Sequence, residues 1–358
     1  MSKGVWLTSA SPGFSQEIFG EINMKFTKIL NDQLDHCYAV MRLQAQGRDF
    51  LVVASEENQA CNAYDLDNDF AKQTVWPDVG GTMTMVQIPG TLNFLATQKF
   101  YPGFNSAACR IVKETWNGNG WDQTIVGDFP YIHRFDIFEK ADGTGLWYVG
   151  CSISNSKKDT DDWSDPGKIW VGEYDDEKEE VVNQRALDIR IEKNHGYKRM
   201  DGYSLITGVE GIFKLTWPVD GKDWQLEKLV DRETSDIFSA DVNGDGKVEY
   251  LAIEGFHGPY LRMMDDQFQT LAKSDADTPF GHAIWGGKLG DREYFIFGWR
   301  EGKQDLELIT DDQLNAELID QQVGPSNVLV YEKGGKQYLL SANREANQVA
   351  VYAIDPGN

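Results

Sequence analysis

The residues with the clearest capacity for chemistry are the histidines, because only five occur among 358 residues. When the chain is divided into seven similar blocks, four of these histidines fall on the same position of their blocks. The residues at this position are His36, Thr82, His133, His195, Asp236, His282 and Asn327. Imidazole and carboxylate groups bind divalent cations and transfer protons near neutral pH. This shared position therefore predicts a metal centre, an acid–base site, or both.

The blocks that carry these residues follow one another at intervals of 41 to 62 residues. Each block has a short strand, a turn and a second strand rich in aromatic and β-branched residues, as in 50–54 and 294–298. A period in the forties with several strands per unit is typical of β-propeller blades. We therefore predict an all-β fold, a seven-bladed β-propeller forming a single domain over residues 1–358. The last block is short, so the segment before Leu34 is expected to supply its outer strand and close the ring.

The first strand of a propeller blade lines the central channel, so the shared position predicts a ring of polar groups at one mouth of that channel. His133, His195, Asp236 and His282 come from consecutive blades and are predicted to hold zinc, manganese or magnesium. The alternative is a hydrogen-bonded polar plug with water in the channel. His36 lies outside this arc and is the predicted catalytic base.

The loops that follow the second strands are expected to rim the same mouth. His257 and Tyr101, from two of these loops, are alternative catalytic residues. Glu254, Arg300 and Arg344 are predicted to bind substrate, because carboxylates and guanidinium groups around a pocket suit a small sugar. The polar loop 152–167 is an insertion in the longest block, and it is either functional or a solvated excursion.

A second motif, at residues 241–249, predicts a calcium site. Asp241, Asn243, Asp245 and Glu249 occupy positions one, three, five and nine of a glycine-containing loop, with the Lys247 carbonyl in support. The loop is not an EF-hand, because its twelfth position is Ala252. The alternative is a hairpin turn that retains Asp and Gly.

The composition argues against two classes of partner. The net charge is −23 and the sequence contains no block of lysine or arginine, so nucleic acid and anionic membranes are disfavoured. The four cysteines are widely spaced, which indicates reduced thiols. Residues 1–10 contain no apolar stretch typical of a secretion signal, so the expected compartment is the cytoplasm.

Residues 239–253 resemble an FG-GAP (VCBS-type) repeat of seven-bladed propellers. Together with the block openings at 193–197 and 280–287, they resemble the propeller domain of the aldos-2-ulose (anhydrofructose) dehydratases. That resemblance implies a metal-assisted lyase that acts on a keto-sugar by β-elimination. Two alternatives stay open: a non-catalytic propeller that binds sugar or protein, and a different propeller enzyme such as a hydrolase or polysaccharide lyase.

Overall fold

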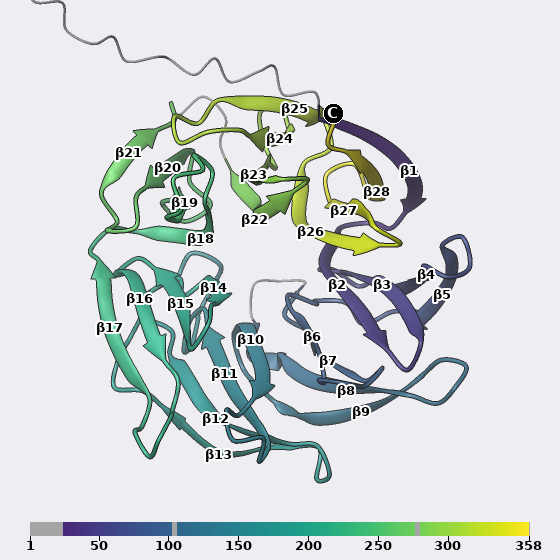
Figure 1. Cartoon of the computed structure of the whole chain (residues 1–358). Helices are drawn as coiled ribbons and strands as arrows, with labels where there is room; N and C mark the ends of the chain where they lie inside the picture. Colours follow the sequence, from purple (N-terminus) through teal and green to yellow (C-terminus); the bar gives the residue numbers. More distant parts are fainter. Residues whose placement is uncertain (1–23, 102–105, 276–279, 358) are drawn as a thin grey trace, which may run out of the picture.

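The computed structural model describes residues 24–101, 106–275 and 280–357. Seven four-stranded antiparallel sheets surround a central channel (Figure 1), so the predicted all-β, single-domain, seven-bladed propeller is confirmed. Residues 1–10, on which the expected compartment partly rests, lie outside the described residues. Within the described ranges, no helix is long and apolar enough to cross a membrane.

The blades are numbered here in chain order, each from its inner strand outward. Blade 1 contains β2 (Cys37–Ala45), β3 (Arg48–Ser55), β4 (Cys61–Asp65) and β5 (Ala71–Trp76). Blade 2 contains β6 (Met85–Gln87), β7 (Phe94–Gln98), β8 (Arg110–Trp116) and β9 (Trp121–Asp128), with the short 3-10 helix η1 (Ser106–Ala108) before β8. Blade 3 contains β10 (Ile132–Glu139), β11 (Leu146–Ser152), β12 (Ile169–Asp175) and β13 (Glu180–Ala186).

The remaining blades repeat this order. Blade 4 contains β14 (Gly196–Arg199), β15 (Tyr203–Gly208), β16 (Gly211–Thr216) and β17 (Gln225–Val230). Blade 5 contains β18 (Thr234–Ala240), β19 (Glu249–Glu254), β20 (Tyr260–Met264) and β21 (Thr270–Lys273). Blade 6 contains β22 (Gly281–Leu289), β23 (Arg292–Trp299), β24 (Leu306–Ile309) and β25 (Ala316–Asp320). Blade 7 contains β26 (Pro325–Lys333), β27 (Lys336–Asn343), β28 (Gln348–Asp355) and β1 (Lys25–Gln33).

Blade 7 closes the ring because its outer strand comes from the other end of the chain. β1 runs antiparallel to β28, with Lys25 opposite Asp355 and Gln33 opposite Gln348. The pairing satisfies the backbone groups that β28 would otherwise expose, and it joins the first and last blades. The two ends of the described chain consequently lie side by side (Figure 1).

Apolar side chains fill the spaces between neighbouring sheets. The second strands are the most deeply buried, since seven of the eight residues of β3 are inaccessible to solvent while the outermost strands are half exposed. Between blades 1 and 2, Phe50 packs edge-on against Trp121, with ring centroids 5.4 Å apart. Burying an aromatic side chain contributes about 1.5–3 kcal/mol, so these contacts hold the blades at fixed angles.

A β-bulge near the start of the inner strand determines which side chain enters the channel. In five blades the ladder between the first two strands skips one residue. Two residues earlier, six of the blades carry a residue with positive φ, such as Phe280 at 64° and Gly81 at 73°. In blades 2 and 4, where the ladder skips no residue, the positive-φ residue identifies the equivalent position. The bulge position is therefore Tyr38, Met83, His133, His195, Ser235, His282 and Ser326.

The bulge position differs from the position predicted from sequence in four blades. His133, His195 and His282 are on it, but Thr82 precedes it by one residue, and Asp236 and Asn327 follow it by one. His36 precedes it by two residues. Each bulge inserts one extra residue into the inner strand. An alignment in which side chains alternate strictly between the two faces of the strand does not count this residue, so it misplaces the bulge position.

Glu114 on β8 is a buried charge with an incomplete set of partners. Its Oε1 accepts a hydrogen bond of 2.6 Å from the Gln123 side chain, and its Oε2 has no partner. Burial raises the pKa of this carboxyl to about 7. A glutamate that is neutral in the folded state gives stability at low pH that is lost as the pH rises through about 7.

Glu114→Gln is therefore expected to stabilise the protein at pH 8.5 by on the order of 1–3 kcal/mol and to change little at pH 5. Urea denaturation at the two pH values measures this difference. Glu180→Gln, at an exposed position on β13, is the matched control. An equal effect of Glu114→Gln at both pH values would show that its carboxyl is ionised throughout.

Candidate functional site

A cavity of about 450 Å³ lies at the mouth of the channel where the inner strands begin. Five bulge-position residues line it, including three histidines, and the other lining residues come from rim loops and the inserted loop. The lining residues are Tyr38, Met83, His133, His195, His282, Glu56, Phe100, Tyr101, Ile153, Thr160, Asp161, Trp163, Phe256, His257, Phe280, Arg300 and Arg344. The cavity therefore combines imidazoles, aromatic rings and a few charged groups.

Two of these histidines are held in one tautomer by the backbone of the next blade. His195 Nδ1 lies 3.2 Å from the carbonyl oxygen of Ser235, and His282 Nδ1 lies 2.5 Å from that of Ser326. A carbonyl oxygen only accepts, so each Nδ1 carries the proton. Each Nε2 consequently presents a lone pair to the cavity. A metal-ligating histidine is usually oriented by such a hydrogen bond from its other ring nitrogen.

His257 brings a third imidazole to the same point from the rim of blade 5. Its ring is stacked between Phe256, at a centroid distance of 4.0 Å, and Phe280, at 4.5 Å. Its backbone has a φ of 49°, a conformation that few residues with a side chain adopt. Its Nε2 lies 3.1 Å from Nε2 of His195. The packing thus holds this ring with its nitrogen facing the two inner-strand histidines.

The three imidazoles form a group suited to a metal ion. One ring nitrogen from each of His195, His257 and His282 lies within 4.8 Å of the others, and no other such group of His, Cys, Asp or Glu occurs in the described residues. Burial lowers the pKa of His257 and His282 well below the usual value and that of His195 to about 3. All three are therefore neutral at pH 7, which is the state that binds a metal.

His133 lies beside this group without joining it. Its ring centroid is 4.3 Å from that of His195, and its Nδ1 is buried without a hydrogen-bond partner. Burial lowers the pKa of His133 well below its ordinary value, so it is also neutral at pH 7. His257, and not the predicted ligand His133, completes the three-histidine group. The position of His133 therefore favours a role other than that of a metal ligand.

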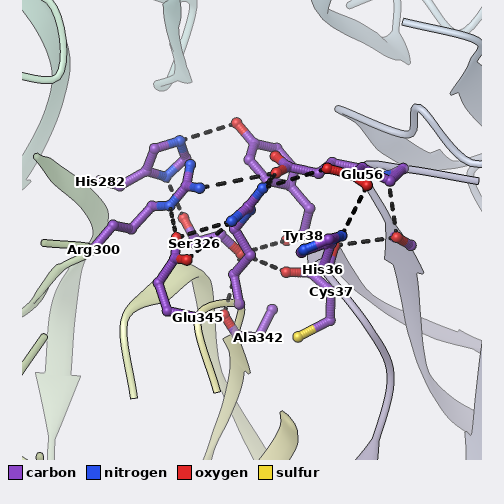
Figure 2. Close-up of polar contacts among 12 residues, drawn as sticks. His36, Cys37, Tyr38, Glu56, His282, Arg300, Ser326, Ala342 and Glu345 are labelled. Carbon is purple, nitrogen blue, oxygen red and sulfur yellow. Dashed lines mark hydrogen bonds and ion pairs between the residues drawn. The ribbon is translucent and has the colours of Figure 1, made fainter. Parts of the chain in front are cut away.

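Tyr38 and a network of charged side chains adjoin His282 in the cavity wall (Figure 2). The Tyr38 hydroxyl lies 3.1 Å from His282 Nε2. Glu56 is buried and forms ion pairs with Arg344 and, at 3.9 Å, with Arg300. Arg300 also pairs with Glu345 at 2.8 Å. The two arginines predicted to bind substrate are therefore fixed at the cavity wall.

Several predicted residues lie elsewhere or near the edge of the site. His36 is 38% exposed, pairs with Glu57 at 3.0 Å and does not line the cavity. Glu254 also lies outside the cavity, where Arg262 binds both of its oxygens. Tyr101 lines the cavity, and burial raises the pKa of its hydroxyl. The structure thus brings Tyr101 near the imidazoles but not His36 or Glu254.

The inserted loop covers part of the cavity mouth. Thr160, Asp161 and Trp163 line the cavity, and Trp163 packs edge-on against Phe256 at 5.4 Å. Asp165 fixes the loop through hydrogen bonds from the side chains of Asn155 and Ser156. The loop is therefore an ordered part of the cavity wall.

Asp236 lies below the imidazoles, in a second cavity of about 630 Å³ that opens along the channel. Its nearest cation is Arg134, with Nη2 4.0 Å from Oδ2, and burial raises the pKa of this carboxyl to about 6. His282 lines both cavities. The predicted arc of ligands is therefore divided, because the bulge places Asp236 one residue beyond the position that faces the histidines.

The loop at 241–249 uses its oxygens to stabilise its own backbone. Asp241 accepts hydrogen bonds from the backbone N–H groups of Gly244 and Gly246, and Asp245 accepts one from Lys247. Glu249 accepts hydrogen bonds from the backbone and the side chain of Asn243. Such bonds are typical of an Asx-rich hairpin turn. Calcium binding at Asp241, Asn243, Asp245 and Glu249 stays a prediction.

No signal in the sequence indicated the place of Tyr38, and His257 was predicted at the rim of the mouth without any indication that it joins the three-histidine group. Tyr38 stands two residues after His36, and only the bulge makes it equivalent to His133 and His282. The role of His257 depends on how Phe256 and Phe280 pack against its ring. A residue with positive φ lies two positions before the bulge position in six of the seven blades, and this backbone feature of the structure aligns them.

No family model and no curated protein sequence matches this chain. Among solved structures, the chain is similar to the crystal structure of the WD40 beta propeller domain of Doa1. The TM-score is 0.55 at 10% sequence identity, with 92% of this chain and 97% of that chain covered. At this identity the likeness shows the propeller fold alone.

Substituting His133→Gln is expected to reduce the loss of stability in acid. The pKa of His133 is lowered in the folded state, so stability is lost as the pH falls below about 6.5, by roughly 1.4 kcal/mol per pH unit for one such group. Denaturation in EDTA between pH 7.5 and 5.5 measures the slope. Thr207→Val, which removes a buried hydrogen bond to Ser235 without removing a titratable group, should shift the curve in parallel. An unchanged slope for His133→Gln would contradict the assignment.

Asp241→Ala is expected to lower the free energy of unfolding by about 1–2 kcal/mol in the presence of EDTA, because two backbone N–H groups lose their acceptor. Chemical denaturation with and without calcium measures the effect. A loss confined to samples with calcium would indicate that the ion, and not the hydrogen bonds, holds this turn.

Proposed function

We propose that the cavity at the channel mouth binds a divalent transition metal through His195, His257 and His282. We further propose that the protein is a lyase that removes water or an alkoxyl group from a keto-sugar. The observation that carries the proposal is the convergence of three neutral imidazoles, two of them held by carbonyl oxygens with Nε2 facing the third. Imidazole ligands favour zinc or manganese over magnesium, which prefers oxygen.

The residues fit such an ion. The Nε2 atoms of His195 and His257 are 3.1 Å apart, a separation at which both can lie about 2.0–2.1 Å from one zinc ion. The aromatic side chains around the group exclude water and hold the rings in place. When bound, the ion supplies a Lewis acid that polarises a carbonyl oxygen.

The residues around the ion supply the proton transfers of a β-elimination. His133 lines the cavity and is neutral at pH 7, so we assign it as the base that accepts the proton from the carbon beside the carbonyl. The C–H electron pair then forms the C=C bond as the β C–O bond breaks. Tyr101 lines the cavity and carries its phenolic proton at neutral pH, and it donates that proton to the leaving oxygen. The products are an enone and water or an alcohol.

The walls of the cavity favour a sugar as the substrate. Trp163 and Phe256 contribute apolar ring surface to the cavity wall, which suits the C–H side of a sugar ring. Glu56 and Arg300 offer an acceptor and donors to its hydroxyl groups. The resemblance of the blade openings to the aldos-2-ulose dehydratases supports the same substrate class. The WD40 neighbour supports the fold and leaves the reaction open, since propellers serve many functions.

Protein purified without chelators is expected to contain zinc or manganese by elemental analysis, and the double variant His195→Ala/His282→Ala is expected to contain none. His36→Ala, at an exposed histidine outside the cavity, is the control for metal content. Incubation of the wild type with 1,5-anhydrofructose and 3-keto-glucosides should produce an enone absorbance that the double variant does not produce.

Failure of the wild type to retain or bind zinc or manganese would contradict the proposal. A non-catalytic propeller that binds sugar or protein would then be the better account. A metal that is bound equally by the wild type and the double variant would place the ion elsewhere in the molecule.

A further inference from the structure

We propose that Tyr38 is a catalytic residue of this cavity whose hydroxyl changes partner when the metal binds. Without metal the hydroxyl donates to His282, and with metal it donates to the substrate oxygen that acquires negative charge. This inference rests on the proposed function and adds a hydrogen-bond donor that no sequence pattern indicates.

The direction of the Tyr38–His282 hydrogen bond follows from the other side of the imidazole. His282 Nδ1 carries its proton because it faces the Ser326 carbonyl oxygen at 2.5 Å. Its Nε2 is therefore an acceptor, and Tyr38 must be the donor across the 3.1 Å that separates the two atoms. Figure 2 shows these residues in one chain of contacts, Tyr38 to His282 to Ser326.

A single lone pair cannot accept this hydrogen bond and bind a metal ion at once. Loading the site therefore releases the Tyr38 hydroxyl, whose one hydrogen bond among the described residues is the bond to His282. The hydroxyl lines the cavity, next to the nitrogen that would hold the ion. A donor in this position is available to the oxygen of a bound substrate.

The ring of Tyr38 is fixed while its O–H bond is free to rotate. Only 2% of the residue is exposed, and its ring packs edge-on against His282 at 5.2 Å within the apolar cluster between blades 1 and 2. The β-bulge holds its backbone. A donor held in place before the reaction stabilises a developing oxyanion without reorganisation, and the loss of one such donor lowers kcat by about 100-fold or more.

The test is a comparison of Tyr38→Phe with the wild type by titration with Co²⁺, followed by visible absorption. The variant should bind Co²⁺ roughly 2- to 10-fold more tightly, because the ion no longer competes with a hydrogen bond. The cobalt-loaded variant should bind acetohydroxamate, an oxyanion probe, roughly 10-fold or more weakly. With a keto-sugar that the wild type converts, kcat should fall about 100-fold.

Tyr64→Phe is the matched control. Tyr64 lies in the same blade as Tyr38 but outside the cavity, and the substitution removes a buried hydroxyl that donates to Asp32. It should leave the affinities for Co²⁺ and acetohydroxamate unchanged. Unchanged Co²⁺ affinity of Tyr38→Phe would overturn the inference, and weaker affinity would show that Tyr38 is itself a ligand. Unchanged acetohydroxamate affinity would overturn the catalytic role. A wild type that binds no Co²⁺ would remove the proposed function together with this inference.

Discussion

The β-bulge at the start of the inner strands is the constraint on which the site depends. It takes one residue out of the ladder in five blades, and among these residues Tyr38, His133 and His282 turn their side chains into the cavity. The carbonyl oxygen of a bulge-position residue faces the neighbouring blade. The preceding blade satisfies that carbonyl with a side chain. Thr84 bonds to the His133 oxygen, Asn327 bonds to the Tyr38 oxygen, and His195 bonds to that of Ser235. The contacts that join the blades thus also orient the imidazoles.

The same packing explains the electrostatic character of the site. Four imidazoles are gathered among aromatic rings in a protein of net charge −23, yet burial and the nearby Arg134 and Arg300 lower the pKa of His195. Keeping these rings neutral costs stability in acid and leaves their lone pairs available at neutral pH. Of the acidic groups in and beside the cavity, Glu56 is held by Arg344, Asp236 lies below the imidazoles, and Asp161 lies on the inserted loop. Affinity for a cation therefore depends on the imidazole nitrogens.

The repeat could be predicted from the sequence in full, but the site only in part. The two outcomes have different physical reasons. Strand alternation and a period in the forties indicate seven blades regardless of local irregularity. His133, His195 and His282 were placed correctly because they occupy the bulge position. Asp236 was misplaced and Tyr38 was not identified, because a bulge inserts a residue without a sequence signature. His257 was predicted at the rim of the mouth, but its approach to His195 depends on tertiary stacking that no local pattern records.

Crystals of the protein soaked with zinc, with anomalous data collected on both sides of the zinc absorption edge, would show whether the three imidazoles hold a metal ion. We expect one strong peak in the channel mouth, bonded to Nε2 of His195, His257 and His282 at about 2.0–2.1 Å. An empty channel mouth, with the imidazoles still bonded to one another and to Tyr38, would rule out the proposed metal site.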